Sequence, residues 1–426
     1  MTTSVSRQAG KPIPRAFKFV WIPPRGVEYT YYFVFSYSII AAYLDIEIPL
    51  FAAGLTVALG GLCLRKMGSR RKEICAPIAL LLACSISFIL IQISMHGASV
   101  MDGTIRSFIL WILGLIIMQS LCLRPGFLHR CTIVIFMVGL IAVPHLAFRG
   151  GTEEVARAAA DIKIGGGMTN ANGLAVWFGF CVVSFGISAL ETKRGIVVRM
   201  LYGLAAVGSL FIVGLTVSRG ALLGCAMALT VGFRRFLKRG FVPVLLLIIF
   251  AGVLLASGLV DQIISGYEER ATEETGSGRF LVWPLVIERF LASPIVGVGW
   301  SAVGTWVPEA DTSIVPHNSF LYFPLSSGIV PFALYVAFWT RAARRSFSDV
   351  GGSEYSPFRT PLLLYALVAF ILADISTEPW ALLALTVGAG SGISHRRERV
   401  LVASSRIRRR RVAPTVQPPS KAGTIR

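Results

Sequence analysis

The chain has 426 residues, of which 54% are hydrophobic and only 15% charged, and its mean hydropathy is +0.69. Its apolar residues come in long blocks rather than alternating with polar ones, which excludes an ordinary soluble domain and predicts an all-α polytopic membrane protein. The net charge of +19 would suit a nucleic-acid-binding protein. However, the basic residues stand in short segments between the apolar blocks, where membrane orientation explains them better, so we expect no nucleic-acid partner.

The hydropathy pattern predicts about 12 transmembrane helices, because the apolar blocks are close to the roughly 17–25 residues that cross a bilayer. The expected spans are 29–45, 48–64, 74–94, 107–123, 131–148, 172–190, 197–216, 219–233, 242–260, 318–340, 361–376 and 379–394. Together they make one membrane domain, residues 29–394. The span at 219–233 is the weakest, because it is short and begins at a charge.

The basic residues between the spans predict the orientation of the chain. With residues 1–28 as a cytoplasmic N-terminal segment, most of the 41 lysines and arginines face the cytoplasm, as the positive-inside rule requires. The basic tail, residues 395–426, is then a cytoplasmic segment that we expect to be disordered. None of the seven cysteines falls in an outward loop, so neither a disulfide nor a metal site is expected.

Two outward loops are long enough to carry function. In the first, residues 149–167, we expect a short surface helix over 153–161, followed by three glycines. The second, residues 261–316, is the expected large periplasmic loop with short helices of its own.

Within the large loop, the apolar stretch 279–291 predicts a helix lying in the membrane interface, with Trp283 at headgroup depth. Residues 294–300 contain two glycines and predict a tight turn. The loop ends at Pro316, directly before His317 and Asn318.

Four short motifs stand at these loops and span edges. They are Thr169-Asn170-Ala171-Asn172-Gly173-Leu174-Ala175, Ser218-Arg219-Gly220, Gly278-Arg279 followed by Trp283 and Pro294 to Gly299, and His317-Asn318. In this order the chain resembles the O-antigen ligase and polysaccharide polymerase family of bacterial inner membranes. The resemblance covers about 165–345 and departs from the family at Ala171, where the family often has a proline.

The resemblance implies a glycosyltransferase that moves glycan from an undecaprenyl-diphosphate-linked donor to a sugar hydroxyl on the periplasmic side, without a metal or other cofactor. The acceptor would be a lipid A core or a growing glycan, which separates ligase from polymerase, and the sequence leaves this choice open. Other polysaccharide-assembly proteins are the expected partners.

The residue types in the motifs suit this chemistry. Arg219 and Arg279 are the candidates for stabilising the diphosphate leaving group, since guanidinium binds phosphate bidentately and stays charged. His317 is the candidate base for the acceptor hydroxyl, and one displacement would invert the anomeric carbon. The candidate substrate-binding residues are Asn170, Asn172, Trp283 and Asn318.

Other interpretations of the same residues stay open. Arg219 and Arg279 would also suit arginines that extend to lipid headgroups, and His317 a hydrogen-bonded interfacial histidine. The two asparagines of the first motif would also suit a helix N-cap. A lipid-linked oligosaccharide flippase is the main alternative function, but it should carry charges within its spans, where this chain has almost none. A cell-wall glycosyltransferase of the shape, elongation, division and sporulation type, or a scaffold, ranks lower.

Overall fold

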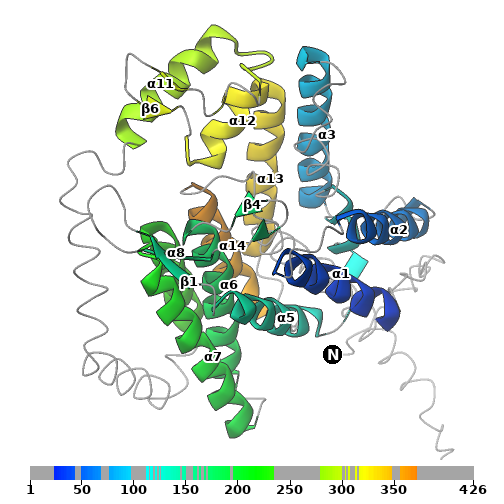
Figure 1. The fold of residues 1–426 in the computed structure, drawn as a ribbon, viewed down its shortest axis with the longest axis vertical. Helices are drawn as coiled ribbons and strands as arrows, with labels where there is room; N and C mark the ends of the chain where they lie inside the picture. The colour runs from blue at the N-terminus through cyan, green and yellow to red at the C-terminus, as the bar shows by residue number, and fades with distance from the viewer. Residues whose placement is uncertain are drawn as a thin grey trace, which may run out of the picture.

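The structure is a computed structural model, and it is mainly helical (Figure 1). It describes residues 24–43, 49–68, 76–96, 112–114, 116–118, 120–121, 124, 126–143, 146–149, 157–160, 163–164, 167–168, 171–191, 195–234, 279–299, 303, 306–307, 312–313, 316–347 and 356–371. The expected spans 242–260 and 379–394, the basic tail and most of the large loop lie outside the described residues.

Most of the described helices overlap predicted spans, but the expected span 131–148 is wrong at its end, where 146–148 pair with another strand. The helices are α1 (Arg25–Tyr43), α2 (Pro49–Gly68), α3 (Ala76–His96), α5 (Phe127–Ala142), α6 (Ala171–Leu190), α7 (Ile196–Leu215), α8 (Arg219–Arg234), α11 (Arg279–Ala292), α12 (Ser319–Ser327), α13 (Ile329–Phe347) and α14 (Ser356–Ile371). The expected span 107–123 is helical at the positions described there. The expected span 318–340 is divided into α12 and α13 at Gly328.

Two of the described helices are long and apolar enough to cross a membrane, Asn172–Leu190 and Ile196–Leu215. Most of the first is covered by other helices, whereas most of the second is not. The uncovered side of α7 is apolar, with Val197, Leu201 and Leu204 exposed. Such a surface is costly in water and suits contact with lipid chains.

Short strands interrupt the helical pattern in the first outward loop. Strand β1 (Leu146–Arg149) pairs antiparallel with β2 (Arg157–Ala160). The other strands are β3 (Lys163–Ile164), β4 (Gly167–Met168), β5 (Trp306–Val307) and β6 (Thr312–Ser313), paired β3 with β4 and β5 with β6. The surface helix expected over 153–161 is therefore wrong for 157–160, because backbone pairing with β1 outweighs the helix propensity of its alanines.

Helices α6, α8 and α14 form the centre of the described bundle. Cys225 Sγ of α8 lies 3.7 Å from the carbonyl oxygen of Gly179 in α6, and the Tyr365 hydroxyl of α14 donates to the Val176 carbonyl at 2.8 Å. The Tyr365 ring packs where Gly179 and Gly224 have no side chain. Small residues let membrane helices approach closely, which explains this glycine pattern.

The contacts also fix the directions of these helices. Gly179 meets Cys225 and, further along, Ile187 meets Gly232, so α6 and α8 run parallel. Gly224 of α8 contacts Tyr365 of α14, and Gly232, further along α8, contacts Pro361, which comes earlier in α14. Helix α14 therefore runs antiparallel to α8.

Helix α13 completes this arrangement. The Thr360 hydroxyl near the start of α14 donates to the Ser346 carbonyl near the end of α13 at 3.1 Å, so α13 and α14 form an antiparallel pair. Helix α12 folds back along α13, because the Ser319 hydroxyl lies 2.8 Å from the Tyr335 hydroxyl and the Phe320 ring contacts Trp339. The start of α12 therefore lies level with the middle of α13 and close to α14. This is the end of the bundle where α6 and α8 start, and we call it the motif end.

Helices α3 and α5 run against the direction of α6, α8 and α13. Gln92 of α3 bonds to the Ser326 carbonyl and the Phe88 ring contacts Phe323, so α3 runs parallel to α12. Cys84 bonds to the Pro331 carbonyl, so α3 is antiparallel to α13, beside which it lies (Figure 1). In the same way, α5 is antiparallel to α6, because His129 lies near Ser188 while Gly139 meets Phe178. The start of α5 therefore lies at the end opposite to the motif end.

Candidate functional site

Each of the four motifs stands at the start of a helix. Helix α6 begins at Ala171 within the first motif, α8 at Arg219, α11 at Arg279, and α12 at Ser319 directly after His317 and Asn318. The first N–H groups of a helix have no partner within the helix, and the helix dipole is positive at this end, so anions are favoured there. Two of these helix starts add an arginine to that field.

The structure brings two predicted residues to the same level of the bundle. Because α6 and α8 run parallel with Gly179 beside Cys225, Asn172 in the first turn of α6 lies level with Arg219 at the start of α8. Arg219 is exposed, and in the described part of the chain it makes no ion pair. Asn170 lies outside the described residues.

His317 and Val217 have an unusual backbone conformation. In the described part of the chain they are the non-glycine residues with positive φ, at 45° for His317 and 49° for Val217. Such a conformation costs about 1–2 kcal/mol for an L-residue with a side chain. It persists where the surroundings impose it, often at functional sites. His317 is itself a predicted site residue, and Val217 stands two residues before Arg219.

Asn318 caps helix α12. Its backbone is extended, with φ −154°, and its side-chain oxygen accepts a hydrogen bond from the Phe320 N–H at 2.9 Å. The residue is buried, whereas the neighbouring His317 is exposed. The cap satisfies one of the free N–H groups of α12 and holds His317 at the entry to the helix. The Asn318 amide oxygen, which we expected to bind sugar, is thus engaged in this cap.

Trp283 lies against the His317 segment. The indole N–H of Trp283 in α11 donates to the carbonyl of Pro316, 2.9 Å from Nε1 to oxygen. The helix predicted over 279–291 is confirmed as α11, but its tryptophan is half-buried and bonded to backbone. Nothing further is described for the side chain of Arg279, which begins the same helix.

A small apolar cluster and a glycine turn attach α11 to α12. Helices α11 and α12 are neighbours (Figure 1), and Val282 and Val286 of α11 are buried together with Leu325 of α12. After α11, the Val298 N–H donates to the Leu325 carbonyl at 2.8 Å, and the Ile329 N–H donates to the Pro294 carbonyl at 2.9 Å. The predicted glycine turn therefore lies across the break between α12 and α13.

Two glycines allow this close approach. At Gly297, with φ 72°, an added Cβ would lie 2.6 Å from the Ser327 nitrogen. At Gly328, with φ 79°, it would collide with the Ile295 carbonyl. Both glycines are thus required by backbone conformation and by space. The predicted span 318–340 ran through the break, because Ser326, Ser327 and Gly328 are flanked by apolar residues on both sides.

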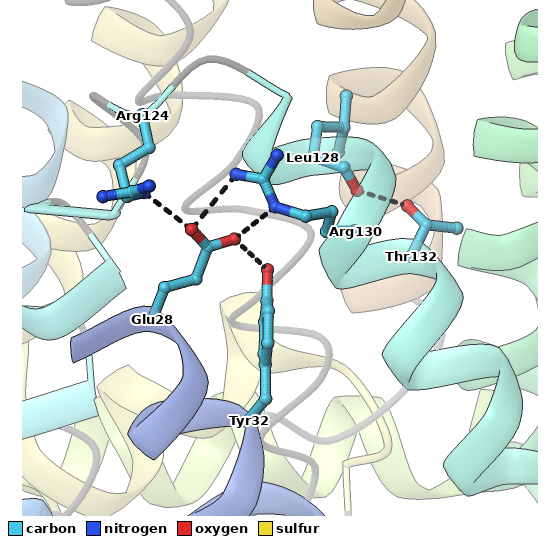
Figure 2. Close-up of polar contacts among 6 residues, drawn as sticks. All are labelled: Glu28, Tyr32, Arg124, Leu128, Arg130 and Thr132. Atoms are coloured by element: carbon cyan, nitrogen blue, oxygen red, sulfur yellow. Dashed lines mark hydrogen bonds and ion pairs between the residues drawn. The ribbon is translucent and has the colours of Figure 1, made fainter. Parts of the chain in front are cut away.

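A second polar cluster lies at the opposite end of the bundle (Figure 2). Glu28 at the start of α1 is buried, and its two carboxylate oxygens bond Arg130 Nε at 2.6 Å and Nη2 at 3.1 Å. The Tyr32 hydroxyl donates to the same carboxylate at 2.8 Å. Arg124 Nε lies 2.6 Å from Glu28 Oε2 and forms an ion pair with it, although its N–H is not aligned for a hydrogen bond.

This cluster shows why the two arginines lie there. Burial raises the pKa of Glu28, but the hydrogen bonds from Arg130 and Tyr32 and the charges of both arginines lower it more, so the pKa lies below its ordinary value. From the sequence, Arg124 and Arg130 were expected only as orientation charges. The one signal for the cluster was a carboxylate at the edge of the first span, facing a basic loop.

Comparison with known proteins identifies part of this architecture. The family model of the O-antigen ligases matches residues 204–336, a segment that runs from α7 to α13. No curated protein matches the chain significantly. Three of the four motifs lie in the matched segment, and the resemblance that they predicted is confirmed. Through this segment the chain is similar to the O-antigen ligases, and its apolar helices indicate a membrane protein.

Proposed function

We propose that the protein is an inner-membrane glycosyltransferase. It takes glycan from an undecaprenyl-diphosphate-linked donor and joins it to a sugar hydroxyl on the periplasmic side, either as a ligase or as a polymerase. Glycan ligation or polymerisation is the general chemistry of the family. The observation that carries the finer proposal is that three of the four motifs start helices at the same end of the bundle, and the fourth is bonded to that end through Trp283.

The proposed reaction is a single displacement. The acceptor hydroxyl oxygen attacks the anomeric carbon, and the bond from that carbon to the donor diphosphate breaks. The hydroxyl proton passes to His317, and undecaprenyl diphosphate leaves with the electron pair of the broken bond. Inversion at the anomeric carbon follows from attack on the side opposite to the leaving group.

The exposed position of His317 supports its role as base. It stands at the start of α12 in a strained conformation, while both neighbouring residues are held, Pro316 by Trp283 and Asn318 by its cap. A base fixed in this way meets the acceptor without a loss of freedom at the moment of reaction. Neutral imidazole is the usual proton acceptor near neutral pH.

Helix starts and arginines together support the diphosphate role. Negative charge grows on the diphosphate as the glycosidic bond breaks, so a site that is positive before the reaction stabilises the transition state more than the ground state. Arg219 supplies a guanidinium at the start of α8, and Arg279 stands at the start of α11. Asn172 at the level of Arg219 is the proposed contact for donor sugar hydroxyls.

The test uses the purified full chain in detergent with a diphosphate-linked oligosaccharide and an acceptor glycan. We expect a joined glycan and free undecaprenyl diphosphate without added metal, and loss of product in His317→Ala. Full turnover by His317→Ala would overturn the assignment of the base. Absence of any joined product from wild type, together with movement of labelled donor across vesicles, would instead favour the flippase.

Ligase and polymerase are separated by the acceptor. A strain without the gene should accumulate unattached long glycan if the protein is a ligase, and short unpolymerised glycan if it is a polymerase. Neither glycan would accumulate if the protein were a scaffold with no role in transfer.

A further inference from the structure

We propose that Trp283 is a positioning residue, which fixes the backbone that carries His317. This inference rests on the proposed function, because it concerns the orientation of the proposed base. From the sequence, Trp283 was expected to contact the membrane interface and the substrate. The structure directs its polar group elsewhere, to the Pro316 carbonyl next to His317.

The indole of Trp283 is bonded to the peptide that leads into His317. The indole has one donor, and at 2.9 Å it is used by the Pro316 carbonyl. That carbonyl belongs to the peptide bond between Pro316 and His317, so the bond fixes the plane of the peptide that enters the strained residue. With φ at 45°, His317 would relax toward ordinary backbone values if this peptide were free to rotate.

Helix α11 is a firm support for this hydrogen bond. Val282 and Val286 on either side of Trp283 in the sequence are buried against Leu325 of α12. The turn after α11 is bonded to both sides of the α12–α13 break through Val298 and Ile329. Contacts with α12 therefore hold α11 in place, and Trp283 of α11 in turn fixes the peptide at the start of α12.

The other side of His317 is held independently of Trp283. Asn318 caps α12 through Phe320, and the Ser319 hydroxyl lies 2.8 Å from the Tyr335 hydroxyl in α13. The imidazole is thus carried between two fixed points, one from the large loop and one from the helix bundle. Removing the loop contact should leave α12 folded and release only the His317 peptide.

The test measures kcat and the donor KM for wild type, Trp283→Phe and Leu291→Ala. Trp283→Phe keeps an aromatic ring and removes the N–H donor. Leu291 lies on the same helix with 65% of its surface exposed and serves as the matched control. We expect Trp283→Phe to lower kcat by about 10²-fold, because a displacement of about 1 Å has that effect, with the donor KM unchanged. Leu291→Ala should match wild type.

A second readout separates positioning from a general structural role. In a His317→Ala background, Trp283→Phe should cause no further loss, because its effect passes through the missing imidazole. If His317→Ala leaves no measurable turnover, the comparison of kcat with KM decides. A second substitution excludes misfolding as the cause. Benzothienylalanine at position 283 keeps the bicyclic shape of the indole and replaces its N–H by sulfur, and it should lower kcat as Trp283→Phe does.

Three results would overturn the inference. A raised donor KM with unchanged kcat would make Trp283 a substrate contact, unchanged kinetics would make the hydrogen bond irrelevant, and an equal loss in both backgrounds would make its role structural. Full turnover by His317→Ala alone would instead refute the proposed base, and with it the premise. The single-variant and double-variant results therefore show which of the two proposals has failed.

Discussion

Replacing Gly328 by alanine should detach the glycine turn from the break between α12 and α13. Gly328 has φ 79° and ψ −167°, a region that only glycine occupies freely, so alanine costs about 1–3 kcal/mol there. The added Cβ would also collide with the Ile295 carbonyl and lie 2.7 Å from the Val296 nitrogen. Moving the turn away breaks the hydrogen bonds from Val298 and Ile329, each worth about 1 kcal/mol. Together these effects destabilise the docked turn by about 3–5 kcal/mol relative to the detached one.

Limited proteolysis of the purified protein in mild detergent measures this cost. When opening is fast compared with cleavage, the cleavage rate follows the open population, so about 3 kcal/mol raises the rate about 100-fold. We expect cleavage within the segment 293–299 and a parallel loss of glycan transfer. Gly208→Ala in α7 is the control, because nothing lies within 4 Å of its added Cβ. Equal cleavage of Gly328→Ala and Gly208→Ala would refute the docking.

Three further changes test other parts of the molecule. Asn318→Ala should lower stability by about 1 kcal/mol and reduce turnover, whereas Asn318→Asp keeps a capping oxygen and should retain most of both, as thermal unfolding and product formation will show. Glu28→Gln removes the carboxylate charge beside Arg124, whose side chain is only 13% exposed, and should cost about 2–3 kcal/mol, measured by unfolding in detergent. The pKa of Glu28 in the folded protein is below its ordinary value of 4.5, so its contribution to stability is present above pH 4.5 and is lost as the pH falls through the folded pKa. The stability of Glu28→Gln should not show this loss at acid pH. Arg219→Gln should weaken donor binding and slow transfer by at least about 10-fold, with Arg234→Gln at the other end of α8 unchanged; equal kinetics of the two variants would exclude Arg219 from the site.

The sequence predicted the helices well because lipid imposes a simple requirement. A span must satisfy all its backbone groups within itself, so a long apolar block has almost no alternative to a helix. The predicted 172–190 became α6 over Ala171–Leu190, and the predicted 197–216 became α7 over Ile196–Leu215. The alternating directions also agree with the contacts, since α6 and α8 run parallel and α14 runs against them.

The break at Gly328 could not be predicted from hydropathy. The short stretch Ser326-Ser327-Gly328 lies between apolar residues, and the backbone groups that the break exposes are satisfied by the turn around Gly297, about 30 residues earlier in the chain. A glycine followed by Pro331 was a local signal, but such pairs also occur in unbroken membrane helices. The backbone pairing of β2 with β1 was equally invisible to local helix propensity.

Of the candidate residues, the sequence predicted the positions at helix starts better than the contacts. The motif order placed Arg219, Arg279 and His317 at helix starts, because polar motifs between apolar blocks must lie where spans begin or end. The roles of Trp283 and Asn318 depend on hydrogen bonds that hydropathy cannot show. The bond from Trp283 reaches a residue 33 positions away, and the Glu28 cluster joins residues 102 positions apart.

The account depends most on the motif end facing the periplasm, and site-directed labelling measures this directly. In a background without the seven native cysteines, Ile295→Cys reports on the motif end and Gly195→Cys on the opposite end. Ile295 is 71% exposed and Gly195 has nothing within 4 Å of an added Cβ, so both positions accept a reagent. A membrane-impermeant maleimide on intact spheroplasts should label Ile295→Cys at once and Gly195→Cys only after permeabilisation. The reverse pattern would place the four motifs in the cytoplasm and contradict the proposed transfer.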